Sequence, residues 1–125
     1  MIVKLTDNVW YGDKPSVVES LGEVQSVLNV AHSIRRPYWK DLGKLDWRVW
    51  YHRLALPDRE PVTFEYMYAL ESILQSILVA DKFPLLCHCR AGGHRGPTAA
   101  FFAAYFFDGC KRLDYWLNEM EKVRS

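Results

Sequence analysis

The feature that most constrains this chain is a short apolar segment that runs into a glycine-containing loop and then into a helical segment. Residues 85–88 (LLCH) follow Pro84 and have the length of a buried strand. The loop CRAGGHRGP comes next, and residues 98–108 (TAAFFAAYFFD) have helical composition and stop before Gly109. This order predicts a loop at the end of a strand in an α/β sheet.

Other segments supply the rest of the predicted sheet. Residues 25–31 (QSVLNVA) are apolar and β-branched, which predicts a buried strand in a parallel sheet. Shorter strands are expected at 2–5 and 8–11, and a partly alternating one at 48–56. We therefore expect an α/β fold, with a central, mostly parallel twisted sheet of about four to five strands flanked by helices.

Helical periodicity is clearest between Pro61 and Asp81. A brief helix ending at Gly22 and a final amphipathic helix at 113–120 are also expected, and the basic, aromatic segment 33–46 is typical of a surface loop or a short helix. The long helix should bury Tyr66, Met67, Leu70, Ile73, Leu74, Ile77 and Leu78, and expose Glu65, Glu71, Ser72 and Gln75.

The length and charge of the chain limit its organisation and partners. With 125 residues, we expect one domain covering 1–125, and we expect it to be a monomer. Sixteen basic and fifteen acidic residues leave a net charge of +1, so no global field steers the chain toward nucleic acid or membranes. Any preference for anions must be local.

Apolar runs and cysteines indicate the expected environment. No run approaches the roughly 20 residues of a membrane span, and the first ten residues lack the apolar core of a signal peptide. Three cysteines, two of them separated by one residue, fit neither a disulfide framework nor a common zinc pair. Free thiols and a cytoplasmic location are the expectation.

The loop carries residue types that suit phosphate chemistry. A phosphate ester is a dianion near neutral pH, so attack on phosphorus needs N–H donors, a fixed positive charge and an ionised nucleophile. Cys89 and Arg95 are separated by five residues, and Gly92 and Gly93 let the backbone approach an anion closely. The amides and the helix dipole would stabilise the thiolate, and Pro97 suits a first helical turn.

The segment HCRAGGHR, with histidine before C-x5-R, resembles the signature loop of the protein tyrosine and dual-specificity phosphatases. The resemblance extends to residues 27–31 (VLNVA), which look like the family's central strand, and to 9–13 (VWYGD), which look like its early strand and turn. The length is similar to that of small atypical dual-specificity enzymes. The resemblance thus implies a phosphatase-like fold with a strand, phosphate loop and helix at the active site.

The resemblance also implies a reaction in two steps. Cys89 attacks phosphorus, and a cysteinyl phosphate is then hydrolysed without a metal or other cofactor. The cradle that binds phosphate would consist of Arg90, Ala91, Gly92, Gly93, His94 and Arg95.

Asp58, in the segment LPDREP, is the candidate general acid. Its place after a predicted strand resembles that of the family's acid loop, and the same carboxylate would next activate water. The alternative is a turn aspartate that caps the following helix, with Glu60 as the substitute acid.

Two further residues could support the loop. By its position in the family's motif, His88 would order the loop around the thiol; otherwise it is a strand histidine bonded to backbone. Asn29 either reaches toward the loop from a neighbouring strand or is a structural strand-end residue.

Gly96 departs from the family's pattern, which has serine or threonine directly after the arginine. That hydroxyl stabilises the leaving thiolate when the intermediate is hydrolysed. Phosphatases of the regenerating-liver type resemble this chain, because they have alanine at this position, also without a hydroxyl, and proline directly after it. Slow hydrolysis of the cysteinyl phosphate is therefore expected.

The substrate class stays open in the sequence. A phosphorylated protein is expected, while Arg90 and His94 could make the pocket mouth basic and suit a phosphoinositide or an RNA 5′-end. Tensin-type lipid phosphatases usually have lysine at the position of Gly93, and RNA triphosphatases often lack the acidic residue. Residues 35–40 are the only other support for RNA.

The sequence leaves three non-catalytic or regulatory alternatives open. Gly96 allows a phosphate-binding or partner-binding module on the same fold. A metal site is disfavoured by the C-x-C spacing, and Cys87 is expected to be a buried strand residue unless it or Cys110 forms a disulfide with an oxidised Cys89. The metal ligands considered were Cys87, His88, Cys89 and His94.

Overall fold

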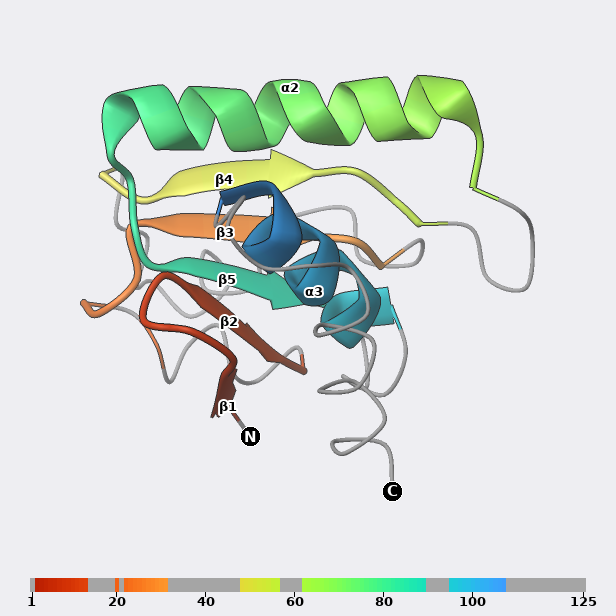
Figure 1. The fold of residues 1–125 in the computed structure, drawn as a ribbon. Coiled ribbons are helices and arrows are strands. Elements are labelled where there is room, and N and C mark those ends of the chain that lie inside the picture. The colour runs from red at the N-terminus through yellow and green to blue at the C-terminus, as the bar shows by residue number, and fades with distance from the viewer. Residues whose placement is uncertain are drawn as a thin grey trace.

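A five-stranded sheet forms the centre of the protein (Figure 1). The computed structural model describes residues 2–13, 20, 22–31, 48–56, 62–89 and 95–107. The strands are β1 (Ile2–Lys4), β2 (Val9–Gly12), β3 (Ser26–Asn29), β4 (Trp50–Arg53) and β5 (Leu85–His88), in the spatial order β1-β2-β5-β3-β4.

The sheet is mostly parallel, as the sequence predicts. Strands β2, β5, β3 and β4 run parallel to their neighbours, and only β1 pairs antiparallel, at the edge beside β2. Every residue of β3 and β5 is buried, because these strands lie inside the sheet with both faces covered. Leu28 and Leu85 therefore belong to the main hydrophobic core, and Val27 and Leu86 belong to a smaller cluster.

Two described helices lie on one face of the sheet (Figure 1). Helix α2 (Phe64–Ala80) begins after Thr63, whose Oγ1 accepts a hydrogen bond of 3.1 Å from the amide of Tyr66, and it ends at Asp81 in the left-handed conformation. Helix α3 (Arg95–Phe107) packs on β2 and β5. Neither of the described helices is long and apolar enough to cross a membrane.

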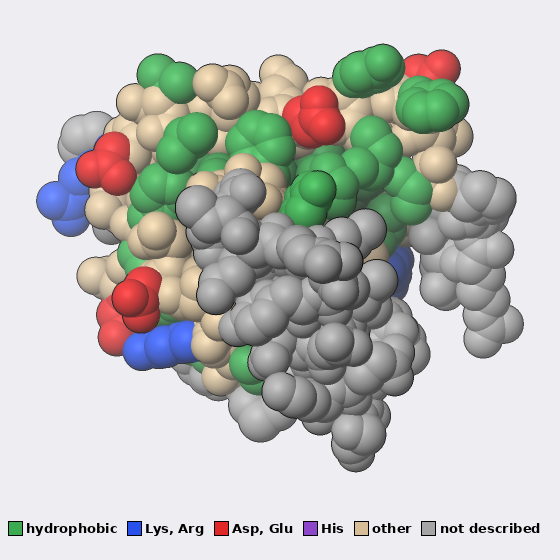
Figure 2. All heavy atoms as spheres, viewed as in Figure 1, with side chains coloured by type: hydrophobic (Ala, Val, Ile, Leu, Met, Phe, Trp, Pro, Cys, Tyr) green, Lys and Arg blue, Asp and Glu red, His purple; other side chains and the backbone are tan. Residues whose placement is uncertain are grey.

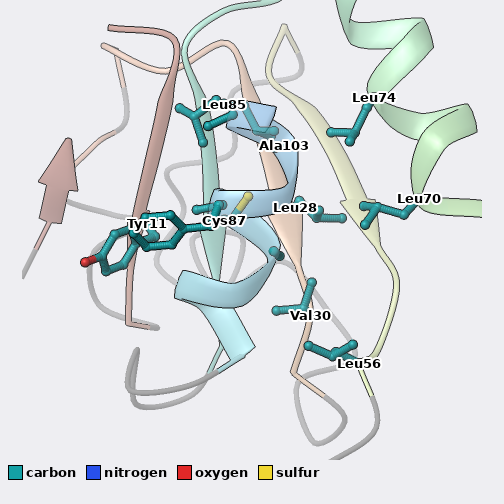
Figure 3. Close-up of a cluster of buried hydrophobic side chains, with 14 of the residues drawn as sticks. Tyr11, Leu28, Val30, Leu56, Leu70, Leu74, Leu85, Cys87 and Ala103 are labelled. Atoms are coloured by element: carbon teal, nitrogen blue, oxygen red, sulfur yellow. The ribbon is translucent and has the colours of Figure 1, made fainter. Parts of the chain in front are cut away.

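The main hydrophobic core fills the space between the sheet and these helices (Figure 3). Leu70 and Leu74 point from α2 toward Leu28 of β3, and Cys87 of β5 faces α3. A smaller cluster on the opposite face of the sheet contains Trp10, Val24, Val27 and Leu86. The α/β class is confirmed, with described helices on one face of the sheet.

The observed elements differ from the predicted ones mainly at their ends. Helix α3 begins at Arg95, three residues before the segment 98–108, and Pro97 lies in its first turn, as the sequence predicts. The prediction that Leu78 is buried is wrong: it is 43% exposed, because Leu74 and Ile77 face the core and Leu78 lies at the margin of that stripe.

Several predicted segments lie outside the described residues. They are the loop at 33–46, the final helix at 113–120 and all of the brief helix before Gly22 except Ser20, which is helical.

Candidate functional site

Three parallel strands bring their carboxyl ends together at one edge of the sheet. His88, the last residue of β5, pairs with Gly12 of β2 on one side and with Asn29 of β3 on the other. The amide of Val30 donates a 2.9 Å hydrogen bond to the carbonyl of His88, so the pairing continues to the strand end. Cys89 follows directly, at the edge where ligands bind in open α/β sheets.

Cys89 and Arg95 stand at the two ends of the loop. Cys89 is 3% exposed, and Arg95 is the first residue of α3 and is partly buried. The residues between them, 90–94, lie outside the described part of the chain. The structure thus brings the predicted nucleophile to the end of the central strand and the predicted clamp to the helix N-terminus.

Gly96 shows how closely α3 approaches the strand ends. A Cβ atom added to Gly96 would lie 3.4 Å from the amide nitrogen of Cys89, 3.4 Å from the carbonyl oxygen of Gly12 and 3.5 Å from Cα of His88. The first turn of α3 therefore packs against the backbone that carries Cys89. The positive end of the helix dipole lies at this edge, where it favours an anion.

His88 is buried and directed at the backbone of the following residue. Its side chain is 1% exposed, and Nδ1 lies 3.2 Å from the carbonyl oxygen of Cys89. Because a carbonyl can only accept, Nδ1 carries the hydrogen, and a neutral ring then has an acceptor at Nε2. This contact ties the histidine to the start of the loop. Its role in ordering the thiol stays a prediction.

Asn29 is fully buried between strands. Its Oδ1 accepts a hydrogen bond of 2.9 Å from the amide of Ala31, and its Nδ2 donates one of 2.8 Å to the hydroxyl of Tyr51 on β4. Burial raises the pKa of Tyr51, while the bond from Asn29 and the charge of Arg53 act in the opposite direction. Tyr51 was not among the predicted site residues. Its place in the partly alternating segment 48–56 could have indicated it.

Cys87 belongs to the core. It is fully buried, it is a free thiol, and burial raises its pKa far above the ordinary value, which favours the protonated form. The interpretation of Cys87 as a buried strand residue is confirmed. Its disulfide with Cys89 stays a hypothesis, and Cys110 lies outside the described residues.

Asp58 and Glu60 also lie outside the described residues. The chain enters their segment at Leu56, which is buried, and leaves it at Val62. The N-cap of α2 is Thr63, so the alternative interpretation of Asp58 as the cap of that helix is wrong. The catalytic role of Asp58 stays a prediction.

An apolar, partly open cavity of about 280 Å³ lies between α2 and α3. Figure 2 shows hydrophobic side chains gathered in the band between these helices. Residues on both sides of the segment that holds Asp58 and Glu60 line the cavity, together with residues of the first turns of α3. Its lining residues are Leu56, Val62, Tyr66, Met67, Leu70, Thr98, Ala99 and Phe102.

The described residues contain no group of three or more His, Cys, Asp or Glu side chains arranged to hold a metal ion. His94, one of the four ligands considered, lies outside the described part of the chain. The expected independence from metals and cofactors stays a prediction.

No protein-family model matches the sequence, and no curated protein matches it. Solved structures do match the fold. A variant of human DUSP28 superposes with a TM-score of 0.74 over 98% of this chain and 82% of its own, at 15% identity. The core catalytic domain of the PP-IP phosphatase SIW14 from S. cerevisiae gives 0.68 over 98% and 75%, at 14% identity.

A third match comes from a virus. OH1 from the Orf virus, described as a tyrosine phosphatase with triple substrate specificity, superposes with a TM-score of 0.67. The match covers 98% of this chain and 74% of OH1, at 20% identity. The likeness to all three structures is one of fold.

Proposed function

We propose, from a fold that this chain shares with the cysteine-dependent tyrosine and dual-specificity phosphatases, that it hydrolyses phosphomonoesters through a cysteinyl phosphate. The observation that carries the proposal is the position of Cys89. It follows the central strand and has the first turn of α3 packed against its backbone, with Arg95 at the helix start. We also propose that residues 1–125 form one phosphatase domain and act as a monomer.

In the first step, Sγ of Cys89 forms a bond to phosphorus while the bond to the leaving oxygen breaks. Arg95 offers a planar fork of donors to two phosphate oxygens, and the amides of 90–94 bind the others. Asp58 gives its proton to the leaving oxygen. The helix dipole of α3 acts in the same direction as Arg95, since both favour the anion at this edge of the sheet.

In the second step, water attacks the cysteinyl phosphate and Asp58 accepts the proton. The bond between phosphorus and sulfur breaks, so phosphate leaves and the Cys89 thiolate is regenerated. His88, bonded to the Cys89 carbonyl, would hold the start of the loop in place through both steps. These steps require no metal ion.

We propose a phosphorylated protein as the substrate. SIW14 is a PP-IP phosphatase and OH1 has triple substrate specificity, so the fold accommodates several phosphate esters. A panel of phosphotyrosine, phosphoserine and phosphothreonine peptides, phosphoinositides and RNA 5′-triphosphate would separate the classes. A rate constant for a peptide below those for a phosphoinositide or RNA would contradict the proposal of a protein substrate.

We expect a cytoplasmic location, because Cys87 is a free thiol and such thiols persist in reducing compartments. Fractionation of the source cells with compartment markers would test this expectation.

The mechanism is tested by rapid mixing with an aryl phosphate in the presence of a metal chelator. The native chain should give a burst of about one phenolate per protein, followed by slow turnover. Cys89→Ser should remove the burst and lower the rate by more than about 10³-fold, and Asp58→Asn should lower it by about 10²–10⁴-fold.

Cys87→Ala is the matched control, because it removes the neighbouring thiol from the core rather than from the site. It should retain the burst. Native protein that binds vanadate but gives neither burst nor turnover would support the binding-module alternative instead.

A further inference from the structure

A second cavity lies at the opposite end of the sheet from Cys89. It has about 670 Å³ of empty space, including open solvent, between the segments that lead into β3, β4 and β5. Figure 1 shows the connection from α2 to β5 descending beside the starts of β3 and β4. Among the described residues, its lining consists of Gly22, Val24, Gln25, Arg48, Val49 and Lys82.

The charge of this lining is one-sided. Arg48 and Lys82 contribute two cations and Gln25 an amide, and none of the described lining residues is acidic. The neighbouring carboxylates in the sequence, Glu23 and Asp81, are exposed and do not line the cavity. A phosphate monoester carries a charge of about −1.5 to −2 at pH 7, which two cations match.

Hydrogen bonds hold the walls of the cavity in place. The carbonyl of Lys82 accepts a 2.8 Å bond from Ser26 Oγ, and the carbonyl of Pro84 accepts one of 3.0 Å from the amide of Gln25. The amide of Trp50 donates a 2.9 Å bond to the carbonyl of Gln25, which joins the two strand starts. The backbone at Gln25 and Lys82 is therefore already ordered, which lowers the entropic cost of binding an anion there.

The side chains of Lys82 and Arg48 also differ in how each could bind an anion. Nζ of Lys82 lies 5.7 Å from the centre of the Trp50 ring, a cation–π contact that restricts the position of the ammonium. Arg48 presents five N–H donors, so it can bind an oxyanion while keeping another contact within the chain.

We propose that this cavity is a second phosphate-binding site, in which Arg48 and Lys82 hold a phosphate group. The four residue steps from Leu85, where β5 begins, to Cys89, which directly follows β5, span roughly 13 Å, so the site is separate from the one proposed for catalysis. The space is continuous with open solvent, so a side chain that carries the phosphate can enter it. The proposal does not depend on hydrolysis by Cys89.

The test is a titration with inorganic phosphate followed by amide NMR, at ionic strength held constant with sodium chloride because exposed charges are screened. Phosphate should shift the amides of Gly22, Gln25, Val49 and Lys82. In the Arg48→Gln/Lys82→Gln double variant, the apparent dissociation constant from these amides should rise by at least about tenfold, because two charge-assisted contacts are lost. Any shift at His88 and Cys89 should be unchanged.

Lys4→Gln is the matched control, because Lys4 also lies over a tryptophan, with Nζ 4.4 Å from the centre of the Trp10 ring, but outside the cavity. It should leave the titration unchanged. Absence of shifts around the cavity in the native chain, or shifts that persist in the double variant, would overturn the proposal. Shifts at His88 and Cys89 report separately on the proposed catalytic site.

A parallel titration with a phosphoserine peptide distinguishes the source of the phosphate. Binding at concentrations at least about tenfold lower than those of inorganic phosphate would assign the site to phosphorylated chains, because the cavity also contacts the carrying residues. Equal affinity would assign it to free phosphate. An unphosphorylated serine peptide should leave the cavity amides unshifted, and shifts equal to those from the phosphorylated peptide would overturn the proposal.

Discussion

At the level of single residues, Gly96 has the most direct consequence for turnover. It is buried, and the nearest atoms to an added Cβ lie at 3.4–3.5 Å, which is ordinary van der Waals contact rather than overlap. A Cβ atom therefore fits beside the backbone of Cys89. In the phosphatases that this loop resembles, a hydroxyl at this position stabilises the leaving thiolate.

Gly96→Ser should therefore accelerate the slow phase after the burst, because its hydroxyl can donate a charge-assisted hydrogen bond to the departing sulfur. The expected gain is about 10- to 100-fold in steady-state turnover, with the burst amplitude unchanged. Rapid mixing with an aryl phosphate measures both. Gly96→Ala adds the Cβ without the hydroxyl and is the control. Equal rates for the serine and alanine variants would contradict a role for the hydroxyl.

At the level of elements, the packing of helix α2 on the sheet can be tested by substitutions on its two faces. Leu74 is fully buried, and it packs in the cluster that joins α2 to the sheet. Leu74→Ala should lower the free energy of unfolding by about 2–5 kcal/mol, through lost apolar burial and the cavity left behind. Urea denaturation followed by circular dichroism measures the change.

Gln75→Ala is the control for helix propensity, because Gln75 is the next residue in the same helix and is exposed. It should change the free energy of unfolding by less than about 0.5 kcal/mol. A loss for Gln75→Ala similar to that for Leu74→Ala would mean that α2 is oriented differently on the sheet.

At the level of the whole molecule, two buried groups limit the pH range of greatest stability. Burial lowers the pKa of His52, so its contribution to stability is complete above about pH 6.5 and is lost as the pH falls through the folded-state value. Burial raises the pKa of Cys87 from its ordinary value of 9.0, so its contribution is complete below about pH 9 and is lost as the pH rises. Stability should therefore be greatest between about pH 6.5 and 9.

Urea midpoints measured from pH 5 to 10 would check this range. His52→Gln should flatten the decline on the acid side, and Cys87→Ala should flatten it on the alkaline side, because each removes the group that titrates there. The comparison uses the slope of the midpoint against pH in each variant, so a lower midpoint at neutral pH does not affect it. An unchanged slope in either variant would show that other groups set that limit.

The sequence by itself determined the class of the fold and the main elements. The predominantly apolar segments at 25–31 and 85–88 predicted the buried strands β3 and β5, since strands covered on both faces do not show strict alternation of apolar and polar residues. The three-and-four spacing after Pro61 predicted α2, because that spacing places apolar residues on one helix face. The C-x5-R segment predicted Cys89 as the nucleophile and Arg95 as the phosphate clamp, since binding and attack of a phosphate depend on residue types at a short, local spacing.

The tertiary structure decided which distant residues meet. The strand order β1-β2-β5-β3-β4 depends on long-range pairing, and it alone brings Gly12, His88 and Asn29 side by side. Likewise, the bond from Asn29 to Tyr51 joins separate strands, and the cavity with Arg48 and Lys82 joins three segments far apart in the sequence. Local patterns carry no information on such contacts, because the packing of the sheet and helices fixes them.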